Sequence, residues 1–438
     1  MLALKAAGAS FGDRVRVKSG SAVFEGVLLP RHDYGDPDCL VLKLSSGYNV
    51  GVAFDSKTLV ERVGGAAKAG KEALPRFPRN PLLPDVSLVA TGGTISARVD
   101  YKTGGVDMFL SPEEILAVAP QVAEVINLRN LISPFRVASE DMTFREWKKI
   151  AAVVAKELSS GAAGVIVTHG TDTLHFTAAA LSFMLRNLEQ PVALVGAQRS
   201  PDRGSFDGTM NLVCGAHYAK SSLAEVAVVM HGTSSDDYCL AIRGTKARKM
   251  HTTRRDAFRP INDLPLARIW PDGRIEGVQG ARARGSGVVE LDDSFEPRTA
   301  LVKVFPGASP EVIDFYVDRK YRGIVLEGTA LGHAPVATLD SRDSWLPSIE
   351  RAVEEGVVVA MATQCLYGST NPFVYANGRR LARAGVVYCR DMLPETAFVK
   401  LGWLLGHKGL SLEGVAARMT ENLCGEINAR LTEAHFLA

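Results

Sequence analysis

The stretch Val86-Ser87-Leu88-Val89-Ala90-Thr91-Gly92-Gly93-Thr94-Ile95 indicates a buried strand that runs into a glycine turn between two threonines. Val and Leu favour the strand, and two glycines let the backbone turn sharply or lie close to a ligand. Ligands of open α/β sheets bind at the carboxyl ends of strands, so Thr94 is a candidate nucleophile. A purely structural turn is the alternative. A phosphate loop is disfavoured, because Ile95-Ser96 stands where the Walker pattern requires Lys followed by Ser or Thr.

Two further segments carry polar side chains of the same kind. Gly164-Val-Ile-Val-Thr-His-Gly-Thr-Asp-Thr173 again places hydroxyls and a carboxylate just after a buried apolar run. Lys249 follows within Arg248-Lys-Met-His-Thr-Thr-Arg-Arg-Asp-Ala-Phe258. Taken alone, Lys249 also fits a surface group of cations formed with Lys246, Arg248, Arg254 and Arg255.

Together, Ala90–Ile95, Thr168–Thr173 and the Lys249 segment resemble the three signature segments of the bacterial-type L-asparaginase/glutaminase family, in the same order and with similar spacing. The resemblance covers about residues 85 to 438. It implies two α/β domains with parallel sheets and an active site at the carboxyl edge of the first sheet. Alternating strands and helices from Asp85 onward favour the same architecture.

Releasing ammonia from a carboxamide requires a nucleophile, a group that takes its proton, and donors for the oxyanion. The resemblance implies that Thr94 is the nucleophile. It also implies that Thr171, Asp172 and Lys249 form a linked set that holds or relays the proton. Tyr101, in the segment from Ser96 to Met108, resembles the loop tyrosine of the family. The general base stays open.

An amino-acid amide presents an ammonium and a carboxylate, and each requires a partner once it is desolvated. Asp172 and Glu140 suit the ammonium, whereas Ser139 and the backbone around Gly170 and Thr171 suit the carboxylate. Ser139-Glu140-Asp141 resembles the Ser-Gln-Asp segment of the family, with Glu in place of the Gln usual in strict asparaginases. This difference favours glutamine over asparagine without deciding between them.

Composition is that of an ordinary globular protein. The 438 residues are 46% hydrophobic and 22% charged with a net charge of +2, which argues against a dominant role in wrapping nucleic acid. Six cysteines lie without a CxxC pair, so the sequence predicts neither a metal site nor a disulfide framework. No apolar run has the length of a membrane span, and we expect a cytoplasmic protein.

The chain divides into four parts. Residues 1–61 contain about four or five short strand patterns and predict a small β-barrel module that binds RNA, binds protein or acts as a spacer. Residues 62–84 form a linker with Pro75, Pro78, Pro81 and Pro84. Residues 85–298 form the first α/β domain, with an interdomain connector from about Arg259 to Arg298, and residues 299–438 form the second.

The added module, with Gly47-Tyr-Asn-Val-Gly51 and Lys249–Phe258, resembles the asparaginase-like subunits of archaeal tRNA-dependent amidotransferases. The resemblance implies a homodimer core within a heterotetramer that contains a GatE-like subunit. This chain would bind a small amide donor and carry no cofactor. The partner would bind Glu-tRNA(Gln) and use ATP and Mg. A free cytoplasmic asparaginase with an accessory domain, and a non-catalytic RNA or protein adaptor, are the alternatives.

Overall fold

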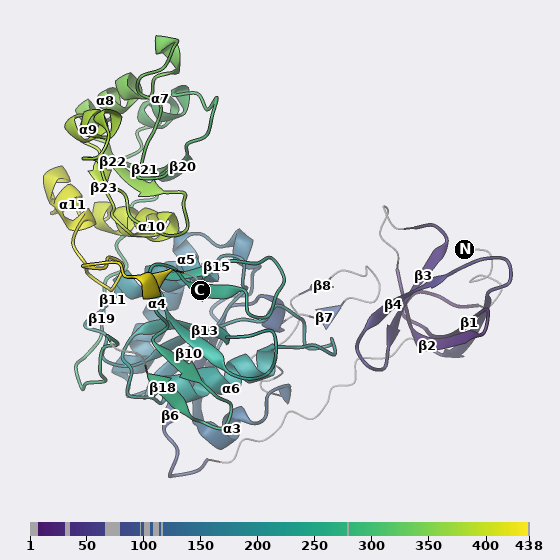
Figure 1. Cartoon of the computed structure of the whole chain (residues 1–438). Coiled ribbons are helices and arrows are strands. Elements are labelled where there is room, and N and C mark those ends of the chain that lie inside the picture. Colours follow the sequence, from purple (N-terminus) through teal and green to yellow (C-terminus); the bar gives the residue numbers. More distant parts are fainter. Residues whose placement is uncertain are drawn as a thin grey trace.

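The computed structural model describes residues 8–30, 36–65, 79–96, 98–99, 106–107, 114, 117–277 and 280–436. Three parts follow one another along the chain, as Figure 1 shows: a small β module, a central α/β domain and a C-terminal α/β domain on the other side of the central one. Most of the predicted linker, from 66 to 78, lies outside the described residues.

The N-terminal module is a five-stranded antiparallel sheet in the order β4-β3-β2-β1-β5. Its strands are β1 (Arg14–Ser19), β2 (Ala22–Leu29), β3 (Cys39–Leu44), β4 (Asn49–Ala53) and β5 (Leu59–Gly64). Alternate side chains of these strands, such as Val15, Val17 and Leu28, fill its own small core. Among the described residues β4 and β5 do not pair, so the structure supports a small β module without showing a closed barrel.

The central domain is built on an eight-stranded sheet in the order β18-β17-β14-β13-β12-β10-β6-β9. Its strands are β6 (Asp85–Ala90), β9 (Asn127–Ile132), β10 (Gly164–Thr168), β12 (Val192–Val195), β13 (Val226–His231), β14 (Cys239–Arg243), β17 (Ala267–Ile269) and β18 (Ile275–Gly277). β9, β6, β10, β12 and β13 are neighbours in the sheet and run parallel to one another. β14, β17 and β18 extend the sheet beyond β13 with antiparallel pairing.

Helices cover both faces of this sheet, as the alternation of strand and helix predicts. They are α3 (Val122–Val125), α4 (Phe144–Ser159), α5 (Leu174–Met184) and α6 (Gly208–Ala219). Side chains of α4 and α5 pack with one face of the sheet, and those of α3 and α6 pack with the other. Helix α4 begins with a capping box, as its sequence Thr143-Phe-Arg-Glu146 indicates: the Thr143 side chain accepts from the helix backbone, and the Glu146 side chain accepts from the Thr143 backbone.

The C-terminal domain has a parallel four-stranded sheet in the order β20-β21-β22-β23. Its elements are β20 (Thr299–Lys303), α7 (Glu311–Asp318), β21 (Gly323–Gly328), α8 (Leu346–Glu354), β22 (Val358–Thr363), α9 (Ala376–Arg383), β23 (Val387–Tyr388), α10 (Pro394–Leu405) and α11 (Leu412–Met419). Phe183 of α5 stacks on Trp403 of α10 with centroids 5.7 Å apart, so the two α/β domains share one apolar core.

Short pairs of strands complete the fold. They are β7 (Arg98–Val99) with β8 (Val106–Asp107), β11 (Leu185–Arg186) with β19 (Glu290–Leu291), and β15 (Ala247–Lys249) with β16 (Phe258–Pro260). The segment that the sequence assigned to a connector, from Arg259 to Arg298, therefore contributes β17 and β18 to the main sheet and β19 to a small one. Strands of two or three residues broken by glycines leave no clear periodicity.

Candidate active site

The first two polar loops lie next to each other because their strands are neighbours. β6 and β10 are parallel and in register, with Ala90 opposite Thr168. Beyond this pair, the backbone N–H and the hydroxyl of Thr91 both donate to the Thr168 carbonyl, at 3.1 and 2.8 Å. The glycine turn and the Gly170 loop therefore leave the sheet side by side.

Glycines let these loops touch backbone to backbone. Gly93 has φ of +83°, and a Cβ on it would lie 2.3 Å from the Gly170 Cα. A Cβ on Gly170 would in turn lie 2.8 Å from the Ser139 hydroxyl oxygen. On the far side, a Cβ on Gly196 would lie 2.7 Å from the Thr171 Cγ2. Four chain segments thus converge at this edge of the sheet, and the three glycine positions leave no room for a Cβ.

The β15–β16 hairpin delivers Lys249 to the second loop. Its ammonium donates to the Thr171 hydroxyl at 2.8 Å and to the Asp172 carboxylate at 2.7 Å. The Lys249 side chain is 11% exposed, whereas that of Asp172 is 62% exposed. Lys249 is therefore turned inward, and its interpretation as one of several surface cations is wrong. Because the Thr171 oxygen accepts from Lys249, the Thr171 proton remains available to another acceptor.

Lys246, at the base of this hairpin, is also not a surface cation. Its side chain is fully buried and pairs with Asp391 of the C-terminal domain at 2.7 Å. The backbone N–H of Asn428 donates to the same carboxylate at 3.1 Å, and the Asn262 amide donates to the Asp391 carbonyl at 3.0 Å. The C-terminal domain thereby anchors the hairpin that carries Lys249.

A buried histidine supports the Gly170 loop from behind. His169 lies 2.7 Å from the Gly170 carbonyl through Nδ1 and 2.8 Å from the Thr177 hydroxyl through Nε2. A carbonyl only accepts, so Nδ1 carries the proton and Nε2 accepts from Thr177. Burial lowers the pKa of His169 to about 4, which keeps the ring neutral and preserves this pair of bonds at neutral pH.

Behind Lys249 lies a second buried group. Burial, aided by Arg248 and Lys249, lowers the pKa of His175 to about 3. Burial also raises the pKa of Glu395, although Arg248 pairs with it at 3.0 Å. Glu395 lies at the start of α10, so the C-terminal domain contributes to the surroundings of Lys249 a second time.

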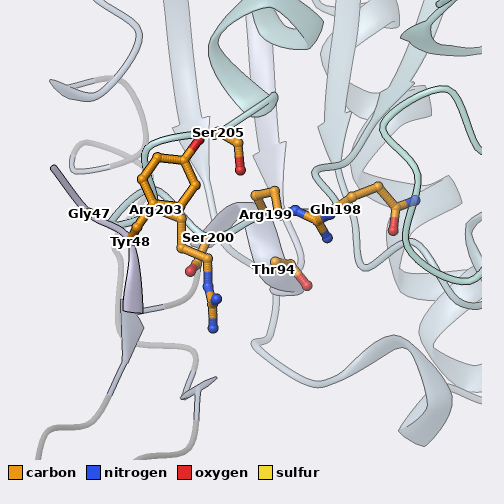
Figure 2. A pocket seen from close by; sticks show the side chains of 8 residues that line it. All are labelled: Gly47, Tyr48, Thr94, Gln198, Arg199, Ser200, Arg203 and Ser205. Atoms are coloured by element: carbon orange, nitrogen blue, oxygen red, sulfur yellow. The ribbon is translucent and has the colours of Figure 1, made fainter. Parts of the chain in front are cut away.

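Thr94 borders a polar pocket of about 530 Å³ (Figure 2). Thr94 is the first residue of a short 3-10 helix, Thr94–Ser96, which directly follows the glycine turn. The other lining residues come from the loop after β12 and from the N-terminal module; they are Gln198, Arg199, Ser200, Arg203, Ser205, Gly47 and Tyr48. None of these was predicted as a site residue. Gly196-Ala-Gln-Arg199 after the Val192–Val195 strand was the available signal for the β12 loop, since it is a third strand-end loop on the same edge.

The remaining predicted residues differ in their surroundings. Ser139 is buried against Gly170, and its carbonyl accepts from the Thr173 hydroxyl at 2.6 Å. Glu140 is exposed beside it. Tyr101, with most of the segment from Ser96 to Met108, lies outside the described residues.

Metal-binding and membrane-spanning features are absent from the described part of the chain. Its His, Cys, Asp and Glu side chains form no group of three or more that could hold a metal ion. Within the same residues, no helix combines the length and apolar character needed to cross a bilayer. All six cysteines are free thiols.

Comparison with known proteins places this geometry in a family. Residues 85–281 match the model of the asparaginase N-terminal domain, 298–419 that of the glutaminase/asparaginase C-terminal domain, and 9–63 that of the GatD N-terminal domain. The GatD subunit of the glutamyl-tRNA(Gln) amidotransferase of Thermococcus kodakarensis is 50% identical over 426 residues, which are 96% of this chain and 95% of that protein. The chain belongs to the GatD family.

Other members of the GatD family are similar over the same span. The corresponding amidotransferase subunit of Methanothermobacter thermautotrophicus is 44% identical over 434 residues, covering 99% of this chain and 97% of its own. Among solved structures, the thermostable L-asparaginase from Thermococcus kodakarensis superposes with a TM-score of 0.70 at 30% identity, covering 79% of this chain and all of that one. The predicted resemblance to both the asparaginases and the amidotransferase subunits is confirmed.

Proposed function

We propose that this chain is the ammonia-releasing subunit of a tRNA-dependent amidotransferase and that it hydrolyses the carboxamide of glutamine or asparagine through Thr94. The observation that carries the proposal is the Lys249–Thr171–Asp172 set, bonded at 2.7 to 2.8 Å. Thr171 and Asp172 lie in the loop after β10, and Thr94 lies in the loop after β6, the parallel neighbour of β10. Full-length similarity to GatD subunits of glutamyl-tRNA(Gln) amidotransferases supports the biological setting.

The proposed reaction has two halves. The Thr94 hydroxyl attacks the amide carbon, and its proton passes by way of Thr171 to Lys249, whose ammonium gives a proton to the Asp172 carboxylate as it receives one. A proton then returns along the same route to the leaving nitrogen, so that ammonia departs and Thr94 is acylated. Water then cleaves the acyl–Thr94 ester and releases the acid. Asp172 holds Lys249 by an ion pair and, as an exposed carboxylate, is suited to the substrate ammonium, as Glu140 is.

The partner completes the pathway in this proposal. A GatE-like subunit would bind Glu-tRNA(Gln) and use ATP and Mg to activate the acceptor, and ammonia from this chain would convert it to Gln-tRNA(Gln). A homodimer of this chain within a heterotetramer is the proposed assembly. Since unregulated glutamine hydrolysis wastes a metabolite, we expect the isolated chain to hydrolyse slowly and the complex with acylated tRNA and ATP to be at least about tenfold faster.

The first test removes the nucleophile. Thr94→Val should abolish ammonia release by several orders of magnitude while the protein stays folded, because no other group forms the covalent intermediate. Thr209→Val is the matched control, since Thr209 is also partly buried but its hydroxyl donates to the Val118 carbonyl from α6. Near-normal turnover of folded Thr94→Val would overturn the assignment.

The second test removes the ammonium. Lys249→Met should lower kcat by about a hundredfold or more and raise KM much less, as expected for a group that assists proton transfer. Lys220→Met is the matched control, because Lys220 is a partly buried lysine that donates to the Val125 carbonyl far from Thr94. An equal loss in both variants would remove Lys249 from the proposed set.

A free asparaginase is the second candidate, favoured by the structural similarity to the Thermococcus kodakarensis L-asparaginase. The two functions separate in one experiment: glutamine and asparagine hydrolysis by the chain alone, with the partner subunit, and with acylated tRNA and ATP added. Equal rates in the three mixtures would favour the free enzyme.

A further inference from the structure

The N-terminal module contacts the central domain at the loop that lines the Thr94 pocket. Lys43 at the end of β3 pairs with Asp202 of that loop at 2.8 Å, and the two side chains are only 8% and 16% exposed. The Ser200 hydroxyl donates to the other oxygen of Asp202 at 2.5 Å. One carboxylate therefore joins the module to the loop and orders the loop at the same time.

Two glycines make this contact close and specific. Gly47, in the turn between β3 and β4, has φ of +84°, and a Cβ on it would lie 2.6 Å from the Gly204 nitrogen. A Cβ on Gly204 would lie 2.5 Å from the Ser46 carbonyl oxygen and 2.8 Å from the Tyr48 ring. Turn and loop thus meet along their backbones, and a side chain at either glycine would separate them.

The same loop is anchored at its other end inside the central domain. The backbone N–H groups of Gln198 and Arg199 donate to the buried carboxylate of Asp207 at 2.9 to 3.1 Å. The Asn211 amide donates to the Gly196 carbonyl at 3.0 Å. The segment between Arg199 and Gly204 therefore spans two supports, one in the core and one on the module.

Between these supports the loop faces the Thr94 pocket. Figure 2 shows Gly47 and Tyr48 on the module side, with Arg203 next to Tyr48 and Arg199 next to Thr94. Within the described part of the chain, the guanidinium groups of Arg199 and Arg203 make no hydrogen bond or ion pair with the protein. Two such cations make the module side of the Thr94 pocket positively charged, which favours an anionic substrate.

We propose that the N-terminal module is a wall of the amide-donor site: its β3–β4 turn, held by Lys43–Asp202 and by the Gly47–Gly204 contact, fixes the β12 loop, with Arg199 and Arg203, beside Thr94. Lys43 and Tyr48 are positioning residues in this scheme. The inference rests on the proposed amide hydrolysis at Thr94 and extends it to a part of the chain outside the asparaginase-like domains. It gives the module a role other than spacer or RNA-binding domain.

The test measures steady-state ammonia release from glutamine and asparagine by the full chain with its partner subunit. Lys43→Met and Asp202→Asn should each raise KM for the donor about five- to tenfold and change kcat less than threefold, the range of an ordinary coupling between two sites. The exchanged pair Lys43→Asp with Asp202→Lys should restore most of the lost affinity.

Two further variants separate docking from folding. Gly204→Ala breaks the contact from the catalytic side and should reproduce the KM increase, although the module is untouched. Lys18→Met, on an exposed position of β1, is the matched control and should leave KM unchanged. Hydrogen exchange of the 44–48 and 200–206 amides reports whether each variant has undocked.

The outcomes distinguish two failures. A wild-type protein that releases no ammonia from either amide overturns the proposed function, and the inference with it. A hydrolysing wild type whose KM is unmoved in variants that exchange rapidly at 44–48 and 200–206 overturns the inference alone. Equal loss of kcat and affinity in every variant, including Lys18→Met, would also overturn it, because it would indicate general destabilisation.

Discussion

Two lysine–aspartate pairs join the central domain to its neighbours, and they differ mainly in what surrounds them. Lys246–Asp391 measures 2.7 Å with both side chains at most 2% exposed, and it lies where the two α/β domains share a core. Lys43–Asp202 measures 2.8 Å at 8% and 16% exposure, and it joins a module that has a core of its own. The comparison indicates a permanent junction on one side of Thr94 and a separable one on the other.

The largest expected effect is at the permanent junction. Asp391→Asn leaves the Lys246 charge buried without its counter-ion and should cost about 3–5 kcal/mol of unfolding free energy in urea titrations. Replacing both partners, as Lys246→Met with Asp391→Leu, should recover part of that loss. A cost below about 1 kcal/mol would mean that water reaches this pair and would break the comparison.

The second-largest expected effect is a loss of stability at acid pH, caused by the buried His169. The pKa of His169 is about 4 in the folded protein and 6.5 for an ordinary histidine, so the unfolded chain binds more protons between these values. Stability contributed by neutral His169 is therefore complete above pH 6.5 and lost as the pH falls toward 4, by about 3 kcal/mol in all. Urea titrations at several pH values measure the slope. His169→Asn should reduce it, whereas the exposed His251→Gln should not.

A double-mutant cycle sharpens the contrast. Lys43→Met and Asp202→Asn should show a coupling energy of about 1–2 kcal/mol in the exchange of the 44–48 amides, as for a partly buried charged hydrogen bond. The global unfolding free energy of the α/β domains should stay unchanged. If instead the whole protein loses stability, the module is part of the same cooperative unit.

Salt should give the smallest effect. Raising the ionic strength from about 0.05 to 0.5 M shortens the Debye length several-fold and should weaken Lys43–Asp202 by a few tenths of a kcal/mol. Lys246–Asp391, which is out of contact with solvent, should not respond. Exchange rates at the module turn and at the β15–β16 hairpin compare the two pairs in one sample. Equal responses would contradict the difference in burial.

The sequence was sufficient to predict the parts that depend on local order. A strand, a glycine turn and a hydroxyl in succession predict Thr94 at a sheet edge, and Thr143 with Glu146 predicts the start of α4. Parallel neighbours then require the Gly93 and Gly170 loops to meet. The family resemblance supplied the link from Lys249 to Thr171, which no local pattern contains.

What the sequence did not predict depends on contacts between distant segments. The sequence around Lys246 suggests a surface cation. In the fold its side chain is buried and pairs with Asp391, 145 residues away in the chain. Lys43 and Tyr48 carry no local sign that they reach a loop near residue 200, because docking of one domain on another leaves no periodicity in either. β17 and β18 were missed because a three-residue strand contains too few residues for alternation to show.

The close approach of Gly93 to Gly170 also has a consequence for sequence variation. If every codon at these two positions were randomised in a library selected for ammonia release, alanine would be as unacceptable as tryptophan, since the first carbon of any side chain already overlaps the other backbone. A larger residue at one position cannot be compensated by a smaller residue at the other, because glycine is already the smallest residue. We expect such a library to return glycine alone at both positions, in any of its codons, while the neighbouring loop positions diversify.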